Sequence, residues 1–187
     1  MNNKISIFDA ESVFKSNEKS NRILAEITQA IAIMLQVDRC FLYVRHPETR
    51  YGQAAFCYCR NPKVEDVSSN EWEEEKPESL EAKDPMFAAA LNCKPSIYVE
   101  DVETADPEVV NRDFEAQEFG HRALIHGHLC QEGNLWGIWQ PCVFDRPRHW
   151  TSGDKQIMET VVSNATPLVK QYVLENIKSI KQKNKKS

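Results

Sequence analysis

Three histidines and a cysteine that could bind a transition metal lie within ten positions of one another. They are His121, His126, His128 and Cys130. Side chains alternate between the two faces of a β-strand, so the last three would share one face. Two imidazoles and a thiolate can hold a transition metal. Histidines in such a pattern are more often packed or hydrogen-bonded, and the sequence places no carboxylate or second cysteine beside them, so we expect no metal and no haem.

The six cysteines form no pattern typical of catalysis. Five lie in apolar runs such as AAFCYC, where a reduced cysteine packs as a small hydrophobic residue. Cys57-Tyr-Cys59 is not the Cys-x-x-Cys of zinc knuckles and redox folds. Cys93 lies outside such a run, beside the positive charge of Lys94. Nucleophilic catalysis needs a base next to the thiol as well, so we predict no catalytic residue.

Length and composition predict a single domain, and the lack of a membrane helix or secretory signal predicts a reducing, cytoplasmic compartment. The chain has 187 residues, 41% of them hydrophobic, and a net charge of −5, which suits a single domain with its own core. No apolar run approaches the roughly 18–20 residues of a membrane helix, and the first residues lack the pattern of a secretory signal. Residues 63–85 hold nine acids against three lysines, whereas residues 178–187 hold five lysines and no acid. An acidic body argues against DNA as a partner.

Hydrophobic periodicity predicts a helix at each end of the chain. Apolar residues recur at three- and four-residue spacing over 9–36 and again over 152–182, where Pro167 should kink or split the helix. Residues 61–83 are polar and show no period, which predicts a long exposed loop. Shorter helices are expected at 86–91 and 107–119.

Two hairpin signals predict an antiparallel sheet. The first joins strands 39–45 and 51–60, and the second joins strands 123–131 and 135–144, with another strand at 96–99. Simple pairing across the second turn sets His126 opposite Trp139. The predicted fold class is α+β: a central antiparallel sheet of five to six strands, with the N- and C-terminal helices packed on one face and a pocket-forming face opposite.

Several short motifs follow one another along the chain in a set order. They are VDRC running into FLYV, PMFAAAL followed by KPSIYVEDV, ALIHGHL, GNLWGI, and PRHW before the last helix. By their order and spacing they resemble a GAF domain of the stand-alone cyanobacterial type, over about residues 20–175. The resemblance divides the chain into a flexible segment 1–20, a GAF domain 21–175 and a lysine-rich helix end or tail 176–187.

The resemblance implies a sensor or regulatory module in signal transduction and no enzyme. GAF domains resemble one another while binding cyclic nucleotides, bilins, haem, iron or small metabolites, and fold does not fix function. The bilin-binding branch attaches its chromophore to a cysteine in the segment that is here 111–121, which contains His121 but no cysteine. We therefore expect no covalent bilin. The reactive cysteines of the branch that reduces free methionine sulfoxide are not matched either.

The resemblance also implies a pocket and a dimer. Candidate pocket residues are Phe41, Tyr43, His126, His128 and Trp139, for which aromatic core packing is the alternative. In GAF proteins the first and last helices commonly form the dimer interface, so we expect a homodimer that signals to an unidentified downstream protein. The predicted function is a sensor that binds an unidentified small ligand. The alternatives are an interaction module without a ligand, a tetrapyrrole or metal sensor, and a free methionine sulfoxide reductase.

Overall fold

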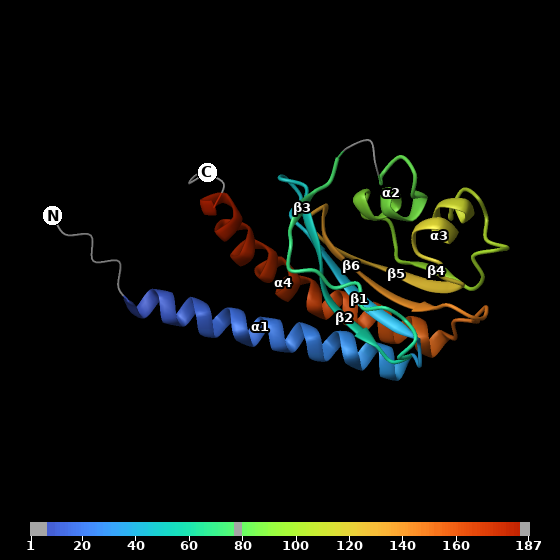
Figure 1. The fold of residues 1–187 in the computed structure, drawn as a ribbon, viewed down its shortest axis with the longest axis horizontal. Helices are drawn as coiled ribbons and strands as arrows, with labels where there is room; N and C mark the ends of the chain where they lie inside the picture. Colours follow the sequence, from blue (N-terminus) through green and yellow to red (C-terminus); the bar gives the residue numbers. More distant parts are fainter. Residues whose placement is uncertain (1–6, 77–79, 184–187) are drawn as a thin grey trace.

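A computed structural model describes the backbone of residues 7–76 and 80–183, and the side chains of residues 19–76 and 80–177. Ten elements follow one another along this part of the chain (Figure 1). The helices are α1 (Ile7–Met34), α2 (Pro85–Leu91), α3 (Arg112–Glu118) and α4 (Ser152–Lys183). The strands are β1 (Arg39–Arg45), β2 (Tyr51–Cys59), β3 (Glu73–Glu74), β4 (Ile97–Val99), β5 (Ala123–Gln131) and β6 (Asn134–Val143).

The six strands form one sheet in the order β3-β2-β1-β6-β5-β4, and every neighbouring pair is antiparallel. Helices α1 and α4 lie along one face of this sheet, whereas α2 and α3 lie on the other (Figure 1). The predicted α+β fold with terminal helices on one face is confirmed. No helix in the described part of the chain is long and apolar enough to cross a lipid bilayer.

The main hydrophobic core lies between the sheet and the terminal helices. Strand β1 turns Leu42 and Val44 toward this core, and both side chains are fully buried. Helix α1 contributes Leu24 and Ile31, and α4 contributes Val169, all of them almost inaccessible to water. Burial of large aliphatic side chains contributes about 1.5–3 kcal/mol each to folding, so this layer is the main source of stability. The opposite face of the sheet carries two smaller clusters.

Local signals explain where the helices begin. The Asp84 carboxylate accepts a hydrogen bond from the backbone N–H of Met86 at 2.9 Å and so caps α2, with Pro85 in the first turn. The cap of α4 is reciprocal: the N–H of Thr151 donates to Asp154 at 3.0 Å, and the N–H of Asp154 donates to the Thr151 hydroxyl at 3.1 Å. Thr151 and Asp154 therefore form a capping box, with Asp in place of the usual Glu.

The terminal helices lie close to their predicted bounds. Helix α1 begins at Ile7, two residues before the predicted start, so most of the segment 1–20 belongs to the first helix. Helix α4 is not split at Pro167, and Val169 just beyond it is fully buried in the core. The lysine-rich tail is helical through Lys183, and residues 184–187 lie outside the described residues.

The acidic segment is not a plain loop. Glu73 and Glu74 form β3 at the edge of the sheet, where Glu73 pairs with Gly52. The next residue, Glu75, makes an ion pair with Arg45 at 2.8 Å, and both side chains are less than a tenth exposed. A charged partner on β1 therefore holds this segment against the sheet, an interaction that periodicity does not reveal.

Candidate ligand-binding site

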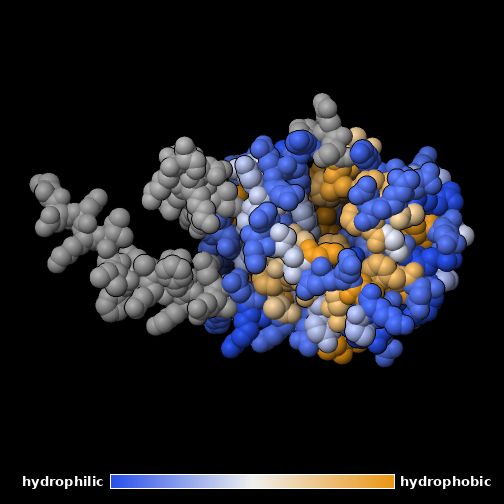
Figure 2. Space-filling model, in the orientation of Figure 1, coloured by the Kyte–Doolittle hydropathy of each residue, from blue (hydrophilic) through white to orange (hydrophobic). Residues whose placement is uncertain are grey.

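A cavity of about 220 Å³ lies on the sheet face opposite α1 and α4. We call it the inner cavity. Figure 2 shows apolar side chains at the bottom of a hollow between the β3 side of the molecule and the side that carries α2 and α3. Three of the predicted pocket residues line the cavity: Phe41 and Tyr43 from β1, and His126 from β5. The other lining residues are Arg39, Ala54, Val67, Leu80, Asp84, Phe87, Phe119, Ile138 and Gln140.

Trp139, also predicted at the pocket, lies on the other face of the sheet. Its side chain is fully buried in the helix-side core, and its indole Nε1 donates to the Thr28 hydroxyl of α1 at 3.1 Å. The reason is a bulge in β6. Cys130 pairs with Leu135, but the preceding residue of β5, Leu129, pairs with Gly137. Trp136 of β6 therefore has no partner on β5. The shift sets Gly127, and not His126, opposite Trp139, and a one-residue shift reverses the face.

His128 lies behind His126 and does not line the inner cavity. Its Nε2 is 2.8 Å from Nδ1 of His126, and its own Nδ1 is 2.7 Å from the backbone oxygen of Lys94. Both rings are at least 95% buried. Burial lowers the pKa of both histidines, and for His126 the neighbouring His128 and His121 lower it further. Both imidazoles are therefore neutral at pH 7.

Arg39 was not among the predicted pocket residues, yet it is buried beside the inner cavity. Its guanidinium packs between the rings of Phe41 and Phe144, at 5.5 and 4.9 Å from their centroids. Nη1 donates to the backbone oxygen of Glu65 at 3.1 Å, and Nη2 donates to Nε2 of His121 at 2.9 Å. Strand β1 therefore presents a positive charge as well as aromatic rings to this face.

His121 links Arg39 to a buried carboxylate. A guanidinium can only donate, so Nε2 of His121 accepts and its proton lies on Nδ1, which donates to Glu115. Burial opposes a charge on His121, and Cys142 and Glu115 outweigh it and raise its pKa to about 9. The adjacent guanidinium, which can only donate, nevertheless holds Nε2 unprotonated. The chain Glu115–His121–Arg39 thus balances one buried negative charge with one buried positive charge.

Tyr43 is fixed at the cavity by the acidic segment. Its hydroxyl donates to Glu75, which also pairs with Arg45. Burial and the Glu75 carboxylate raise the pKa of Tyr43, so the phenol keeps its proton. Asp84 lines the opposite wall, and burial raises the pKa of its carboxyl to about 6. No pattern in the sequence marks Asp84 as a cavity residue, although its role as a helix cap can be predicted.

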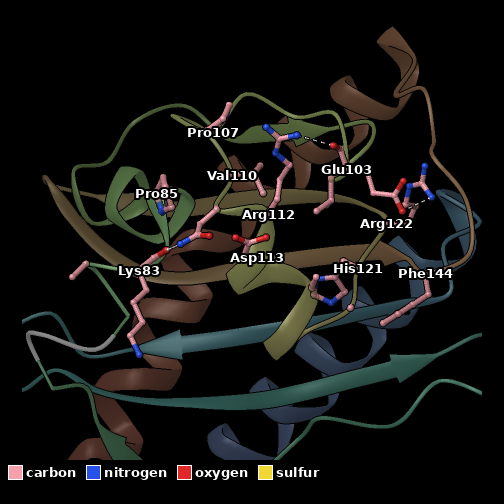
Figure 3. Close-up of a pocket in the computed structure, with 15 residues that line it drawn as sticks. Lys83, Pro85, Glu103, Pro107, Val110, Arg112, Asp113, His121, Arg122 and Phe144 are labelled. Carbon is pink, nitrogen blue, oxygen red and sulfur yellow. Dashed lines mark hydrogen bonds and ion pairs between the residues drawn. The ribbon is translucent and has the colours of Figure 1, made fainter.

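A second hollow, of about 840 Å³, lies between α2 and α3 at the surface; we call it the outer cleft (Figure 3). His121 lines it, so the Arg39–His121 contact lies between the outer cleft and the inner cavity. Its two arginines already have partners: Arg122 pairs with Asp101 and Glu103, and Arg112 donates to the backbone oxygen of Glu103. The outer cleft is therefore a less specific candidate site than the inner cavity.

The cysteines and histidines do not assemble a metal centre in the described part of the chain, where no group of three or more potential ligands comes together. Cys130 follows the bulge and its thiol donates to the backbone oxygen of Ala90 at 3.7 Å. Burial raises the pKa of this thiol, and Cys93 beside it raises it further, which disfavours the thiolate that nucleophilic catalysis needs.

An antiparallel sheet with terminal helices on one face and a small lined cavity on the other is the architecture of GAF domains. The chain belongs to the GAF domain family, whose model matches residues 20–166. GAF domains are generally sensory modules without catalytic activity of their own, and nothing in the described residues points to an enzyme. A comparison with curated protein sequences gave no significant match.

Solved structures of GAF domains share this fold at low sequence identity. The GAF domain of a phosphoenolpyruvate-protein phosphotransferase from Acinetobacter superposes with a TM-score of 0.59 at 8% identity, covering 89% of this chain and 95% of that one. The phycoerythrobilin-bound GAF domain of a cyanobacterial phytochrome gives 0.64 at 14% identity, with coverages of 89% and 95%. A far-red cyanobacteriochrome photoreceptor gives 0.62 at 18% identity, with coverages of 89% and 94%. At these identities the likeness establishes the fold.

Proposed function

We propose that this GAF domain is a signalling sensor that binds a small molecule in the inner cavity. The observation that carries the proposal is the joint placement of Phe41, Tyr43 and His126 around 220 Å³ of space on the sheet face that α1 and α4 leave uncovered. Binding pockets typically combine an apolar lining with a few polar groups that orient the ligand. Here the polar groups are His126, Asp84, Gln140 and Arg39.

The sheet offers a route from the ligand to the rest of the protein. Alternate residues of β1 face opposite layers, with Phe41 and Tyr43 at the inner cavity and Leu42 and Val44 in the core beneath the terminal helices. A ligand that prefers one position of β1 would therefore favour one packing of α1 and α4. The binding event would be transmitted as a shift in helix packing.

The inner cavity does not suit a bilin, although related structures contain one. Its volume of about 220 Å³ is below the roughly 300–1,000 Å³ of pockets for drug-sized ligands, whereas a linear tetrapyrrole has four rings and two propionate chains. Residues 111–121 also contain no cysteine for a thioether bond. We therefore favour a compact ligand over the biliverdin or phycoerythrobilin of those structures.

Ligand-observed NMR with a library of one- and two-ring fragments tests the proposal. Ala54 lines the inner cavity, so Ala54→Leu should fill part of it and abolish binding of the fragments that the wild type binds. Ala116→Leu is the matched control, because it adds the same atoms in the outer cleft. If fragments bind equally to the Ala54→Leu protein, they bind outside the inner cavity, and this outcome, like a wild type that binds no fragment, would overturn the proposal.

We also propose that the protein forms a homodimer through α1 and α4. A shallow groove of about 240 Å³ runs between these helices, and its apolar residues are Ile27, Val161, Ala165 and Leu168. Leu174 of α4 is 36% exposed, and Ile33 of α1 is 50% exposed. A second copy that packed along this groove would cover this surface.

Sedimentation velocity at micromolar concentration tests the dimer. The wild type should sediment as a dimer, and Leu168→Glu should yield monomer, because it places a charge in the groove. Val109→Glu is the control: Val109 is 38% exposed and lies outside the groove. A wild type that stays monomeric, or a Leu168→Glu protein that stays dimeric, would exclude this interface.

A further inference from the structure

Two histidines form a hydrogen-bond chain that ends at the inner cavity. The backbone oxygen of Lys94 can only accept, so Nδ1 of His128 carries a proton and donates to it across 2.7 Å. The backbone N–H of His128 donates to the Ser96 hydroxyl at 3.1 Å and holds the strand in place. The segment before β4 thus holds both the ring of His128, through Lys94, and its backbone, through Ser96.

The protonation of His128 determines that of His126. A neutral imidazole has one N–H and one bare nitrogen, so Nε2 of His128 accepts. Nδ1 of His126, 2.8 Å away, must therefore donate to it. The remaining nitrogen of His126, Nε2, is then unprotonated, and no described residue offers it a hydrogen bond. His126 is 97% buried and lines the inner cavity.

An unpaired acceptor buried beside a cavity selects for a hydrogen-bond donor. We propose that the inner cavity takes a compact, flat one- or two-ring molecule that presents an N–H or O–H group to Nε2 of His126. This assignment rests on the proposed sensor function, and it defines the chemical class of the ligand. His126 positions the ligand and His128 fixes the tautomer of His126.

The other residues that line the inner cavity suit the same class of ligand, a compact, flat molecule that donates a hydrogen bond. Phe41, Phe87 and Phe119 supply aromatic surface on which a flat ring can pack. Asp84 provides a carboxylate, which is a second acceptor. The Nη atoms of Arg39, the nearest strong donors, are directed to Glu65 and His121. Nε of Arg39 is a buried donor without a partner in the described residues, whereas Nε2 of His126 and the Asp84 carboxylate are the acceptors among the lining residues that a donating ligand would meet.

The test compares two probes of almost the same shape, indole and benzofuran. Indole has a ring N–H where benzofuran has an oxygen, so only indole can donate to Nε2. Isothermal titration calorimetry should show that the wild type binds indole about tenfold or more tightly than benzofuran. The preference should disappear in His126→Phe. His149→Phe is the matched control, because the side chain of His149 is 77% exposed, and it should keep the preference.

A direct measurement supports the assignment even if His126→Phe does not fold. Nitrogen-15 NMR of the wild-type histidine side chains should show Nδ1 of His126 protonated and Nε2 bare, and indole should shift the Nε2 signal. The opposite tautomer would overturn the inference. Equal affinity for the two probes would overturn it as well but leave the sensor proposal standing. Failure of both probes, with no fragment bound either, would overturn both proposals.

Discussion

The indole Nε1 of Trp139 donates a hydrogen bond to the Thr28 hydroxyl across 3.1 Å and so joins the centre of the sheet to helix α1. Both residues are almost completely buried. The Thr28 hydroxyl in turn donates to the backbone oxygen of Leu24 at 2.8 Å. This short chain is the polar contact that fixes α1 against the face opposite the cavity.

Thr28→Val should destabilise the fold by about 1–3 kcal/mol, because it leaves a buried indole N–H without a partner. Urea unfolding of the wild type, Thr28→Val, Trp139→Phe and the double variant measures the coupling between the two residues. Thr28→Val should cost less in the Trp139→Phe protein, where no N–H is left unpaired. Strictly additive costs would show that the hydrogen bond contributes no stability.

Asp84→Asn should stabilise the protein at pH 8 by about 1–2 kcal/mol. Burial raises the pKa of Asp84 to about 6 in the folded state, above its usual value of about 3.9 in an unfolded chain. The ionised carboxylate therefore disfavours the folded state above pH 6, and this penalty fades as the pH falls toward 4. Asn keeps the cap on Met86 without the charge.

Urea unfolding of the Asp84→Asn variant at pH 8 and pH 4 checks this expectation. Asp84→Ala is the control, since it removes the helix cap as well as the charge. Its increase in unfolding free energy should be about 1 kcal/mol smaller than that of Asp84→Asn. An Asp84→Asn protein that is no more stable than the wild type at pH 8 would contradict the raised pKa. Loss of ligand binding in the stabilised protein would show that the carboxylate serves binding.

The buried histidine pair should make the protein less stable below pH 6.5. The pKa values of His126 and His128 are lowered in the folded state, so below pH 6.5 the unfolded chain takes up protons that the folded protein does not. The contribution of the pair to stability should be constant above pH 6.5 and fall by up to about 1.4 kcal/mol per pH unit for each histidine below it.

The dependence of the unfolding free energy on pH is best measured in the Asp84→Asn variant. In the wild type, protonation of Asp84 raises stability as the pH falls below 6 and so opposes the effect of the histidines. Unfolding free energies at pH 5, 6, 7 and 8 should give a shallower acid slope in His126→Phe than in its parent. His149→Phe should leave the slope unchanged, because His149 is exposed. A parent whose stability does not change between pH 7 and pH 5 would show that the pair is not buried and neutral.

Gly52→Ala should damage the cavity wall and destabilise the fold by about 1–3 kcal/mol. A methyl group at position 52 would lie 1.8 Å from the hydroxyl oxygen of Tyr43, so the ring would have to leave Glu75. Gly153→Ala is the control, because its nearest neighbour is 3.6 Å away in the first turn of α4 and Ala favours helix. Thermal unfolding and fragment binding of both variants check this; an unaffected Gly52→Ala protein would contradict the placement of Tyr43.

The sequence alone was sufficient to predict the layers and every element except β3. Periodic apolar residues in α1 and α4 and the turn at Glu132-Gly133-Asn134 are local signals, because each reflects contacts within a few residues. Alternation along β1 also placed Phe41 and Tyr43 together on one face, and the structure brings both to the inner cavity.

Tertiary structure decided which residues of the second hairpin meet that cavity. The bulge after Leu135 moves Trp139 to the core and brings Ile138 and Gln140 beside His126, and a single unpaired residue of this kind leaves no clear mark in the pattern. Arg39 and Glu75 became site residues only through partners 82 and 32 positions away, His121 and Tyr43. Such contacts depend on how distant segments pack, whereas periodicity records only the neighbours along the chain.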